Sequence, residues 1–521
     1  MKCLIWATVI FSLLYGLKFN KLNQIPAHIR FHPPSAKSYK PLYHFSPSSN
    51  WINDPNGLIY LEGNYHLFFQ YNPFGNQWGH MSWGHAVSKD LISWKELPVA
   101  IPEFTNSDSV TTSIFSGSAI VDAHNTAGFA KDNGKTPLVA IYTSNVMRKD
   151  VQLAQHESVA YSLDKGITWK QYPGNPVLDV GSKDFRDPKV FWYQPKKKWI
   201  MLVSMATEYK VQFYESANLK NWKLLSEFGG IGNIDKVWEC PDIFQLPVQG
   251  TKMKKWVLSL SAGHPEKGYL AMQYFVGNFN GEKFKADALN YPLYMDYGKD
   301  YYAGITYNNI PPPDGRVIMM GWASCWNYAN DIPTGNGWRG LYAIPRELQL
   351  TSSSKGFRLM QNPIREFDSF KKVALSFRNI QVDSIFTIPF NNDSYELDFT
   401  VEPGISKVAG IKILKNKGEE TVISYESSSK QLLLDRTKSG NVEFNKSFPS
   451  VEKANVSLHN GSLKVKVLVD KCIVEVFVND GETTITDLVF PRENKGKIQL
   501  FSEGGKAIFK SVKVWNIKSV R

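Results

Sequence analysis

Three carboxylic acids, Asp54, Asp187 and Glu239, begin separate copies of one short sequence pattern, in which each acid opens a hairpin-like segment. Two carboxyl groups on opposite sides of an anomeric carbon can cleave a glycosidic bond, because one protonates the leaving oxygen while the other attacks or activates water. A lone acid in a turn is usually a turn residue or a cap. The shared position and the nearby Trp51 and Trp238 weaken that interpretation and predict an acid-based hydrolytic site.

These acids lie in a repeat that extends over most of the first 350 residues. Pairs of strand-like runs separated by a turn occur five times, with no sustained helical period, which indicates an all-β fold. The paired runs are 54–60 with 65–69, 116–121 with 137–142, 187–193 with 199–202, 239–244 with 256–260, and 302–307 with 317–322. A second element, from serine to tryptophan, follows three of the pairs at 88–94, 162–169 and 216–222.

Five such units predict a five-bladed β-propeller catalytic domain over residues 38–350. Each blade of a propeller starts at the central axis, so equivalent positions at the heads of separate hairpins converge on one funnel. We therefore expect Asp54, Asp187 and Glu239 to meet in one acidic pocket, although more than a hundred residues separate the first from the second.

The sequence pattern of the chain changes after residue 350. The run Thr351-Ser-Ser-Ser-Lys-Gly356 is typical of a loop, and residues 363–372 suit a short helix, so we expect a linker over 351–375. Alternating strands such as 395–401 and 463–469 then predict a C-terminal β-sandwich over 376–521. This part contains no catalytic cluster.

Composition excludes some classes of protein. The chain has 43% hydrophobic residues, enough to bury a core in each domain, and its net charge of +12 is spread in short groups such as Lys196–Lys198. We therefore expect no nucleic-acid partner. One lysine followed by a short apolar run predicts a signal peptide at 1–18, with a retained N-terminal anchor as the alternative, and the mature protein is expected to be secreted or periplasmic, with no membrane span.

The cysteines and possible modification sites add little chemistry. Without the leader only Cys240, Cys325 and Cys472 remain, which allows one disulfide at most and lacks the spacing of a zinc site. We expect no metal and no cofactor. Four N-glycosylation sequons, which matter only in a eukaryotic host, lie at Asn392, Asn445, Asn455 and Asn460.

Several motifs around the acids resemble the signature blocks of glycoside hydrolase family 32, the family of invertases, inulinases and levanases. The blocks are Trp51-Ile-Asn-Asp-Pro-Asn-Gly57, Phe115-Ser-Gly-Ser118, Phe185-Arg-Asp-Pro188 and Trp238-Glu-Cys-Pro241. Further matches are Asp296-Tyr-Gly-Lys-Asp-Tyr-Tyr302, Gly321-Trp-Ala-Ser-Cys-Trp-Asn-Tyr328, Trp338-Arg-Gly340 and Val474-Glu-Val-Phe-Val-Asn-Asp480. The resemblance covers nearly all of the chain after the leader.

The resemblance implies a five-bladed propeller with a C-terminal β-sandwich and net retention of configuration through a covalent fructosyl intermediate. In that scheme Asp54 attacks the anomeric carbon, and Glu239 protonates the leaving oxygen and later activates water. Asp187 holds two fructose hydroxyls. Because neighbouring carboxylates repel one another, one must keep its proton at working pH, and Glu239 is the expected acid. Arg186 is expected to keep Asp187 ionised and to donate to the sugar, or else to form a structural ion pair between blades.

The same resemblance implies contacts to the substrate. Polar contacts and apolar walls around the fructose ring are expected from Asn53, Gln70, Trp78, Phe115, Ser116 and Trp326. The resemblance leaves open whether Trp326 or Trp338 forms the outer wall. Glu475 also lies in a motif, but it alternates with Val and Phe along a strand and is expected to be structural.

The sequence favours an exo-acting β-fructofuranosidase that removes terminal fructose from levan or inulin and also splits sucrose. A sucrose-preferring invertase and a fructosyltransferase are the alternatives within the family. A non-catalytic fructan-binding protein is the alternative of a different class, since propellers and sandwiches also serve as lectins. Linkage preference, preferred chain length and oligomeric state stay open.

Overall fold

The computed structural model describes residues 38–131, 134–335, 337–354 and 356–520. The signal peptide expected at 1–18 lies outside this part of the chain. The described residues form seven β-sheets and four short 3-10 helices, which confirms the expected all-β class. No helix among them is long and apolar enough to cross a bilayer.

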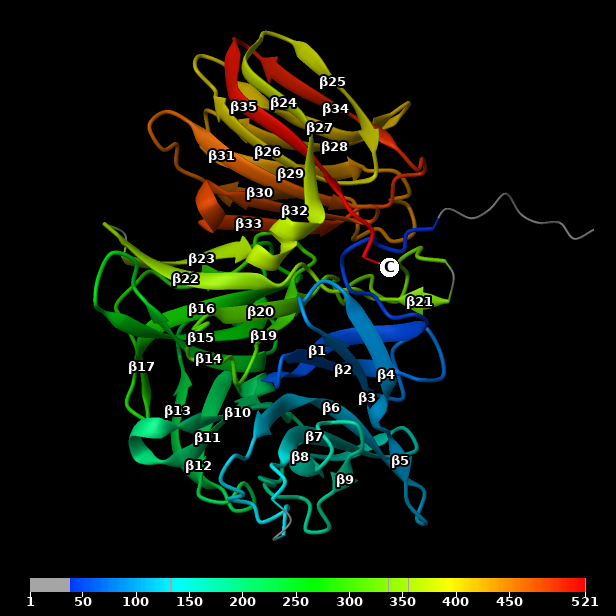
Figure 1. The fold of residues 1–521 in the computed structure, drawn as a ribbon, viewed down its shortest axis with the longest axis vertical. Helices are drawn as coiled ribbons and strands as arrows, with labels where there is room; N and C mark the ends of the chain where they lie inside the picture. Colours follow the sequence, from blue (N-terminus) through cyan, green and yellow to red (C-terminus); the bar gives the residue numbers. More distant parts are fainter. Residues whose placement is uncertain (1–37, 132–133, 336, 355, 521) are drawn as a thin grey trace, which may run out of the picture. The chain divides into compact units, whose positions relative to one another are not determined.

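Five of the sheets are the blades of a propeller (Figure 1). The first contains β1 (Asn50–Leu61), β2 (Asn64–Asn72), β3 (Ser82–Ser88), β4 (Trp94–Ile101) and the late strand β21 (Trp338–Arg339). The second contains β5 (Phe104–Thr105), β6 (Val110–Val121), β7 (Leu138–Arg148), β8 (Val151–Ser162) and β9 (Lys170–Gln171). The third contains β10 (Phe185–Tyr193), β11 (Lys198–Met205), β12 (Lys210–Ser216) and β13 (Lys223–Gly229), with η1 (Gln194–Lys196) and η2 (Ala206–Glu208) between strands.

The last two blades complete the ring. The fourth contains β14 (Glu239–Pro247), β15 (Lys254–Gly263), β16 (Leu270–Phe279), β17 (Phe284–Ala286) and β18 (Leu293–Tyr294), and the fifth contains β19 (Tyr302–Thr306), β20 (Val317–Trp322), β22 (Arg346–Ser353) and β23 (Gly356–Pro363). Each predicted pair of runs forms a hairpin at the start of a blade. In the second blade that hairpin is β6–β7, and the short β5 pairs with the other edge of β6. The innermost strands contact one another in the order β1, β6, β10, β14, β19, and β19 contacts β1.

The serine-to-tryptophan element forms a turn before the outer strand of a blade. In its first copy Ser88 Oγ accepts from the backbone N–H of Leu91, Asp90 Oδ1 accepts from Ile92 and Ser93, and Trp94 Nε1 donates to the Leu91 carbonyl. The copy that ends at Trp222 makes the same set of bonds. The element therefore satisfies its own backbone groups, which explains why it recurs.

The fifth blade extends beyond the expected domain boundary. Strands β22 and β23 pair along their length from Arg346 to Pro363, so the fourth strand of the blade lies inside the region predicted as a linker. The run Thr351–Gly356 resembles a loop because it contains the tip of this hairpin. The rest of the expected linker holds η3 (Arg365–Phe370) and the start of β24 (Lys371–Val382).

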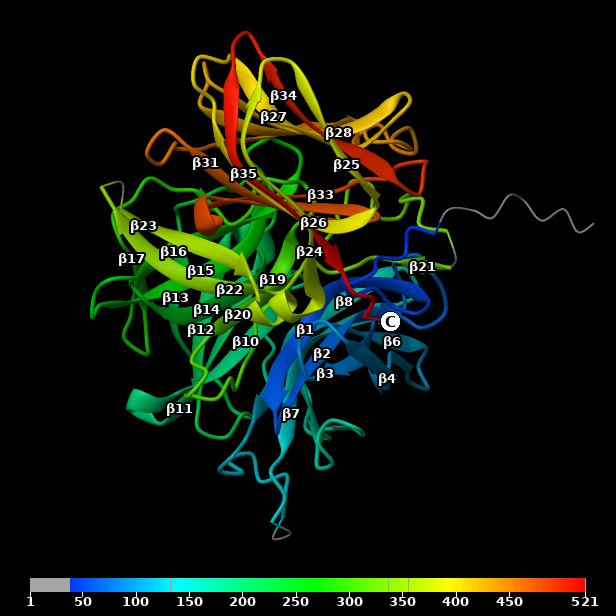
Figure 2. The ribbon, with the colours of Figure 1, turned by 45° about the horizontal axis from the view of Figure 1, so that its top comes forward.

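The remaining strands form a sandwich of two six-stranded sheets (Figure 2). One sheet has the order β24-β35-β26-β31-β32-β33 and adds β26 (Ser394–Glu402), β31 (Leu463–Asp470), β32 (Ile473–Val478), β33 (Thr483–Leu488) and β35 (Ala507–Ile517), with η4 (Asn479–Gly481) after β32. The other has the order β25-β34-β27-β28-β29-β30 and contains β25 (Ile385–Asn392), β27 (Val408–Asn416), β28 (Glu419–Glu426), β29 (Gln431–Lys438), β30 (Val451–Asn455) and β34 (Gly496–Glu503). Alternating residues such as Val465 and Val467 fill the core between them.

A buried charge network joins the sandwich to the propeller. Glu475 of β32 is fully buried and accepts hydrogen bonds from the guanidinium of Arg346 at 2.8 Å, the imidazole of His44 at 2.9 Å and the backbone N–H of Ile344 at 2.7 Å. Arg346 also pairs with Asp296 at 2.9 Å. All of these contacts are to protein groups, in agreement with the structural role expected for Glu475.

Candidate active site

All five innermost strands have an irregularity at the same level of the propeller. The register with the second strand of the blade shifts between Ile52 and Pro55, Ile114 and Gly117, Arg186 and Lys189, Glu239 and Asp242, and Tyr302 and Ile305. A β-bulge leaves a residue unpaired and re-aims its side chain. Asp187 and Cys240 lie within these bulges in the left-handed backbone region, with φ of 69° and 48°. The bulges therefore turn the heads of several strands into one site.

The structure brings all the predicted site residues to one cavity of about 380 Å³. Its lining consists of Asn53, Asp54, Gln70, Trp78, Phe115, Ser116, Arg186, Asp187, Glu239, Trp326 and Asn330. Beneath Ser116 and Asp187 only a residual space of about 10 Å³ remains. Lys189 lines that space and forms a buried ion pair with Asp242 at 3.1 Å.

Asp54 is held by hydrogen bonds on both carboxyl oxygens. Ser116 Oγ donates to Oδ2 at 2.6 Å, and Asn53 Nδ2 donates to Oδ1 at 3.1 Å. The indole N–H of Trp51 donates to Asn53 Oδ1 at 2.8 Å, which fixes the amide with its NH₂ group toward Asp54. Burial raises the pKa of Asp54 and the charge of Glu239 adds to this, whereas the bonds from Ser116 and Asn53 oppose it.

Asp187 is positioned through its backbone as well as its side chain. Its N–H donates to Thr143 Oγ1 at 2.9 Å, and its Oδ2 accepts from the N–H of Cys240 at 3.0 Å. The Thr143 hydroxyl in turn donates to the fully buried Glu157 at 3.1 Å. Burial and the charge of Glu239 raise the pKa of Asp187 to about 7, against the opposing charge of Arg186.

Glu239 is bound from two neighbouring blades. Arg186 donates to its Oε1 from Nε at 3.0 Å and from Nη2 at 2.9 Å, and Tyr302 donates to its Oε2 at 2.5 Å. As expected, the charge of Arg186 lowers the pKa of Asp187, but burial outweighs it, and the hydrogen bonds of Arg186 go to Glu239, Asp184 and Gln155. The same guanidinium lines the cavity, so it is both an ion pair between blades and a candidate sugar donor.

Aromatic rings form the wall and mouth of the cavity. Trp78 is 47% exposed and meets Phe115 and Trp326 edge-on, with ring centroids 6.3 Å and 6.5 Å away. Trp326 is backed by Trp51 in a stacked arrangement at 6.0 Å. Trp338 is only 1% exposed and does not line the cavity, so the outer aromatic wall contains Trp326.

The sequence did not single out Tyr302, Cys240, Lys189, Thr143 or Asn330 for this site. The first two lie inside recognised motifs, and Cys240 Sγ is 3.6 Å from oxygens of both Asp54 and Asp187. Lys189 directly follows Asp187 and Pro188, so a comparison of the five equivalent strands could have pointed to it. Thr143 and Asn330 carry no local signal, because they reach the site from a second strand and from a loop.

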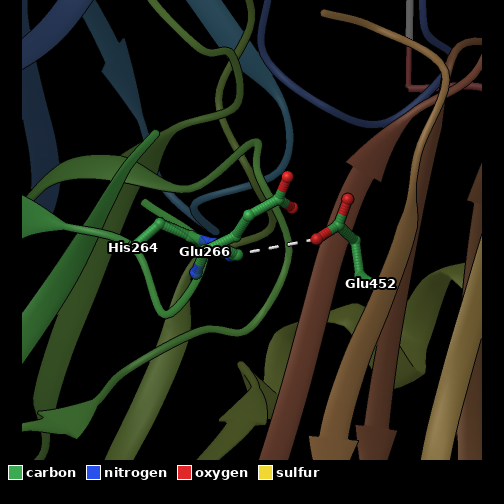
Figure 3. Close-up of side chains that lie close together, drawn as sticks. All are labelled: His264, Glu266 and Glu452. Carbon is green, nitrogen blue, oxygen red and sulfur yellow. Dashed lines mark hydrogen bonds and ion pairs between the residues drawn. The ribbon is translucent and has the colours of Figure 1, made fainter. Parts of the chain in front are cut away.

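A second group of potential ligands lies apart from this cavity. His264, Glu266 and Glu452 hold ligand atoms within 4.8 Å of one another, with Glu452 coming from β30 of the sandwich (Figure 3). The ammonium of Lys299 lies 3.0 Å from Glu266 and 3.5 Å from Glu452. His264 contacts the Tyr297 carbonyl and the Glu266 N–H through its two ring nitrogens. Lysine therefore supplies the positive charge, and the group is an ion-pair cluster between domains.

Comparison with known proteins matches the whole architecture. The family model "Glycosyl hydrolases family 32 N-terminal domain" matches residues 44–363, and "Glycosyl hydrolases family 32 C terminal" matches residues 363–516. The chain is 42% identical over 530 residues to a levanase of Bacillus subtilis, covering all of this chain and 75% of that protein. It is 40% identical over 519 residues to an extracellular exo-inulinase of Aspergillus ficuum, covering 92% and 95%.

Solved structures give the same result. The crystal structure of exo-inulinase from Aspergillus awamori superposes with a TM-score of 0.87 at 37% identity, covering 93% of this chain and 99% of that one. A β-fructofuranosidase of Schwanniomyces occidentalis, complexed with fructosyl-erythritol, gives 0.82 at 33% identity, covering 93% and 98%. With both domains matched and the acids gathered in one cavity, the chain belongs to glycoside hydrolase family 32.

Proposed function

We propose that the protein is a retaining, exo-acting β-fructofuranosidase that hydrolyses terminal fructose from fructans such as levan and inulin, and from sucrose. The observation that carries this proposal is a single cavity lined by three carboxyl groups, those of Asp54, Asp187 and Glu239. The similarity to a levanase and to exo-inulinases supports the choice of a fructan substrate.

In the proposed mechanism Asp54 attacks the anomeric carbon of fructose while Glu239 protonates the glycosidic oxygen. The bond from carbon to the leaving oxygen breaks, and a covalent fructosyl ester forms on Asp54. Glu239, now ionised, takes a proton from water as that water attacks the same carbon and releases Asp54. Two displacements at one centre retain its configuration.

The remaining lining residues are proposed to bind and orient the fructosyl unit. Asp187 accepts hydrogen bonds from two sugar hydroxyls, and Arg186, Asn53, Gln70 and Ser116 make polar contacts to the ring. Gln70 Nε2 is bound to the Ile114 carbonyl at 2.9 Å, which leaves its amide oxygen for the sugar. Phe115, Trp78 and Trp326 provide apolar walls, which suit the faces of sugar rings.

A time course of products from levan, inulin and sucrose tests the proposal. Fructose as the sole early product from the polymers is expected. Activity confined to sucrose would identify an invertase, transfer products would identify a fructosyltransferase, and ladders of oligosaccharides would contradict exo-attack. In Glu239→Ala, release of fructose should be lost while binding of substrate persists, and unchanged release would refute the role of Glu239.

The nucleophile has its own test. Asp54→Asn removes the attacking anion but keeps an acceptor for Ser116, so turnover should be abolished while unfolding stays cooperative. Mass spectrometry of the wild-type enzyme trapped during turnover should find a fructosyl adduct that Asp54→Asn lacks. An active Asp54→Asn enzyme would refute the mechanism.

We also propose that the protein acts outside the cytoplasm, as the name of the Aspergillus ficuum exo-inulinase states for that relative. Removal of residues 1–18 by a signal peptidase is the expected route. N-terminal sequencing of protein recovered from culture medium would test this, and a cell-bound, uncleaved chain would contradict it.

A further inference from the structure

Asn330 lines the mouth of the cavity, and one hydrogen bond fixes the orientation of its side-chain amide. Its Oδ1 accepts from the backbone N–H of Trp78 at 3.2 Å. Only the oxygen end of an amide can face an N–H donor, so the NH₂ group lies at the opposite end. Among the described residues, no protein acceptor binds that NH₂ group. Two N–H donors are therefore left for a ligand.

The backbone around Asn330 is held from both domains. On the propeller side its carbonyl accepts from Gln77 Nε2 at 3.3 Å. On the sandwich side the next residue, Asp331, accepts from Asn445 Nδ2 at 2.7 Å. Two residues earlier, the buried hydroxyl of Tyr328 donates to Asp300 at 2.7 Å and accepts from Arg436 at 2.9 Å. The amide is thus preorganised, which lowers the entropic cost of binding through it.

The burial of the lining residues separates two parts of the cavity. Asn53, Gln70, Ser116 and Asp187 are at most 7% exposed and surround the inner part, where the acids lie. Trp78 and Asn330 are exposed at the mouth. A fructosyl unit that reacts with Asp54 must occupy the inner part, so the group attached to it extends past the mouth. Asn330 is therefore on the side of the leaving group.

We propose that Asn330 is a specificity-determining residue that donates hydrogen bonds to a sugar leaving group lying beside Trp78 and Trp326 at the mouth of the cavity. This inference rests on the proposed hydrolysis of fructosides. Sugar hydroxyl and ether oxygens match the two N–H donors, and the two indole rings, which meet edge-on at 83°, provide an apolar surface next to the amide. A leaving group without such oxygens gains nothing from this amide.

Two substrates that share the fructosyl unit and differ in the leaving group test the proposal. One is a short β-linked fructo-oligosaccharide, and the other is 4-nitrophenyl β-D-fructofuranoside. Asn330→Asp keeps an oxygen for the Trp78 N–H and removes the donors, and Asn330→Ala removes both. Gln77→Ala is the matched control, because it removes a hydrogen bond to the Asn330 backbone carbonyl and leaves the Asn330 side-chain amide in place.

Both Asn330 variants are expected to lower kcat/KM on the oligosaccharide about 10-fold, the effect of one or two lost hydrogen bonds, and to change the aryl fructoside less than about 2-fold. Gln77→Ala should leave the ratio of the two substrates unchanged. If the wild-type enzyme is active, two results for the Asn330 variants would overturn the role of Asn330. These are equal losses of kcat/KM on both substrates and no loss on the oligosaccharide. A wild-type enzyme that cleaves neither substrate would instead refute the proposed function. Thermal melting confirms that each variant is folded.

Discussion

The phenol of Tyr302 donates a hydrogen bond of 2.5 Å to Oε2 of Glu239, and the two residues come from the innermost strands of adjacent blades. Together with the two bonds from Arg186 to Oε1, this bond fixes the carboxyl plane of Glu239. The geometry of proton transfer to a glycosidic oxygen therefore depends on the packing of the fourth blade against the fifth.

Removal of this phenol should impair turnover without unfolding the protein. Tyr302→Phe keeps the buried ring and deletes one hydrogen bond to Glu239, which corresponds to a loss in kcat of about 10-fold. KM should change little, because the phenol is bound to Glu239. A purely structural role would lower the melting temperature and leave kcat unchanged, so kinetics and melting are measured on the same sample.

Asp187 should make activity depend on pH, and its ionised form should lower the free energy of unfolding. Its pKa is raised from 3.8 to about 7, first by burial and then by the charge of Glu239. The stability that the protonated form contributes is complete below pH 3.8 and is lost as pH rises through 7. Asp187→Asn mimics the protonated acid, so it should be inactive yet more stable than the wild type at pH 8, by the order of a few kcal/mol. Identical stability curves for the two proteins would contradict this.

The wild-type enzyme should lose activity on the alkaline side near neutral pH. Burial and the charge of Glu239 raise the pKa of Asp187 to about 7, so the charge of the cluster formed by Asp54, Asp187 and Glu239 changes as pH rises through that value. A profile of kcat/KM against pH measures this limb. A rate that stays flat to pH 9 would show that the ionisation of Asp187 does not affect turnover.

A buried histidine pair in the first blade should make the propeller sensitive to acid. His66 Nδ1 and His85 Nε2 are 3.0 Å apart, and burial lowers their pKa values to about 4 and about 3. Their contribution is complete above the ordinary pKa of 6.5 and is lost as pH falls toward the folded values. Each histidine should lower the free energy of unfolding by up to ~1.4 kcal/mol per pH unit in that window.

Urea unfolding between pH 7 and pH 4.5 measures this decline. In His66→Gln the slope should be smaller than in the wild type. His80, whose side chain is 59% exposed, provides the control, and His80→Gln should keep the wild-type slope. An unchanged slope in His66→Gln would assign the acid sensitivity to other groups.

His44 should have the opposite pH dependence. Burial by itself lowers the pKa of His44, but its bonds to Asp470 and Glu475 outweigh burial and raise the pKa to about 9. Its stabilising charge is fully present below pH 6.5 and is lost as pH rises through 9. His44→Gln leaves two buried carboxylates with less compensation, so it should cost about 3–5 kcal/mol at pH 7 and progressively less above pH 9.

Chemical unfolding of His44→Gln at pH 7 and pH 10 distinguishes the loss of the His44 charge from a loss of packing. His459, with a side chain 55% exposed and paired with Glu482, is the matched control. His459→Gln should change the free energy of unfolding by less than about 1 kcal/mol at either pH. A cost of His44→Gln that does not depend on pH would contradict the role of the charge.

The sequence by itself determined the repeat and the number of blades, and it singled out the three acids that the structure brings into one cavity. Those features depend on short-range patterns, because a strand pair with its turn and the residue that starts it are contiguous in the chain. The boundary of the fifth blade was missed, because the polar tip of the β22–β23 hairpin has the composition of a loop.

Only the tertiary structure decided which groups touch. Next to the bulges at the starts of the inner strands, Arg186 donates a hydrogen bond to Glu239 and not to its neighbour Asp187. Tyr302 donates a hydrogen bond to the same carboxyl group. Asn330 meets Trp78, 252 residues earlier in the chain, because a loop anchored by the sandwich lies over the first blade. Such contacts depend on backbone irregularities and on packing between distant segments, and a local sequence pattern specifies neither.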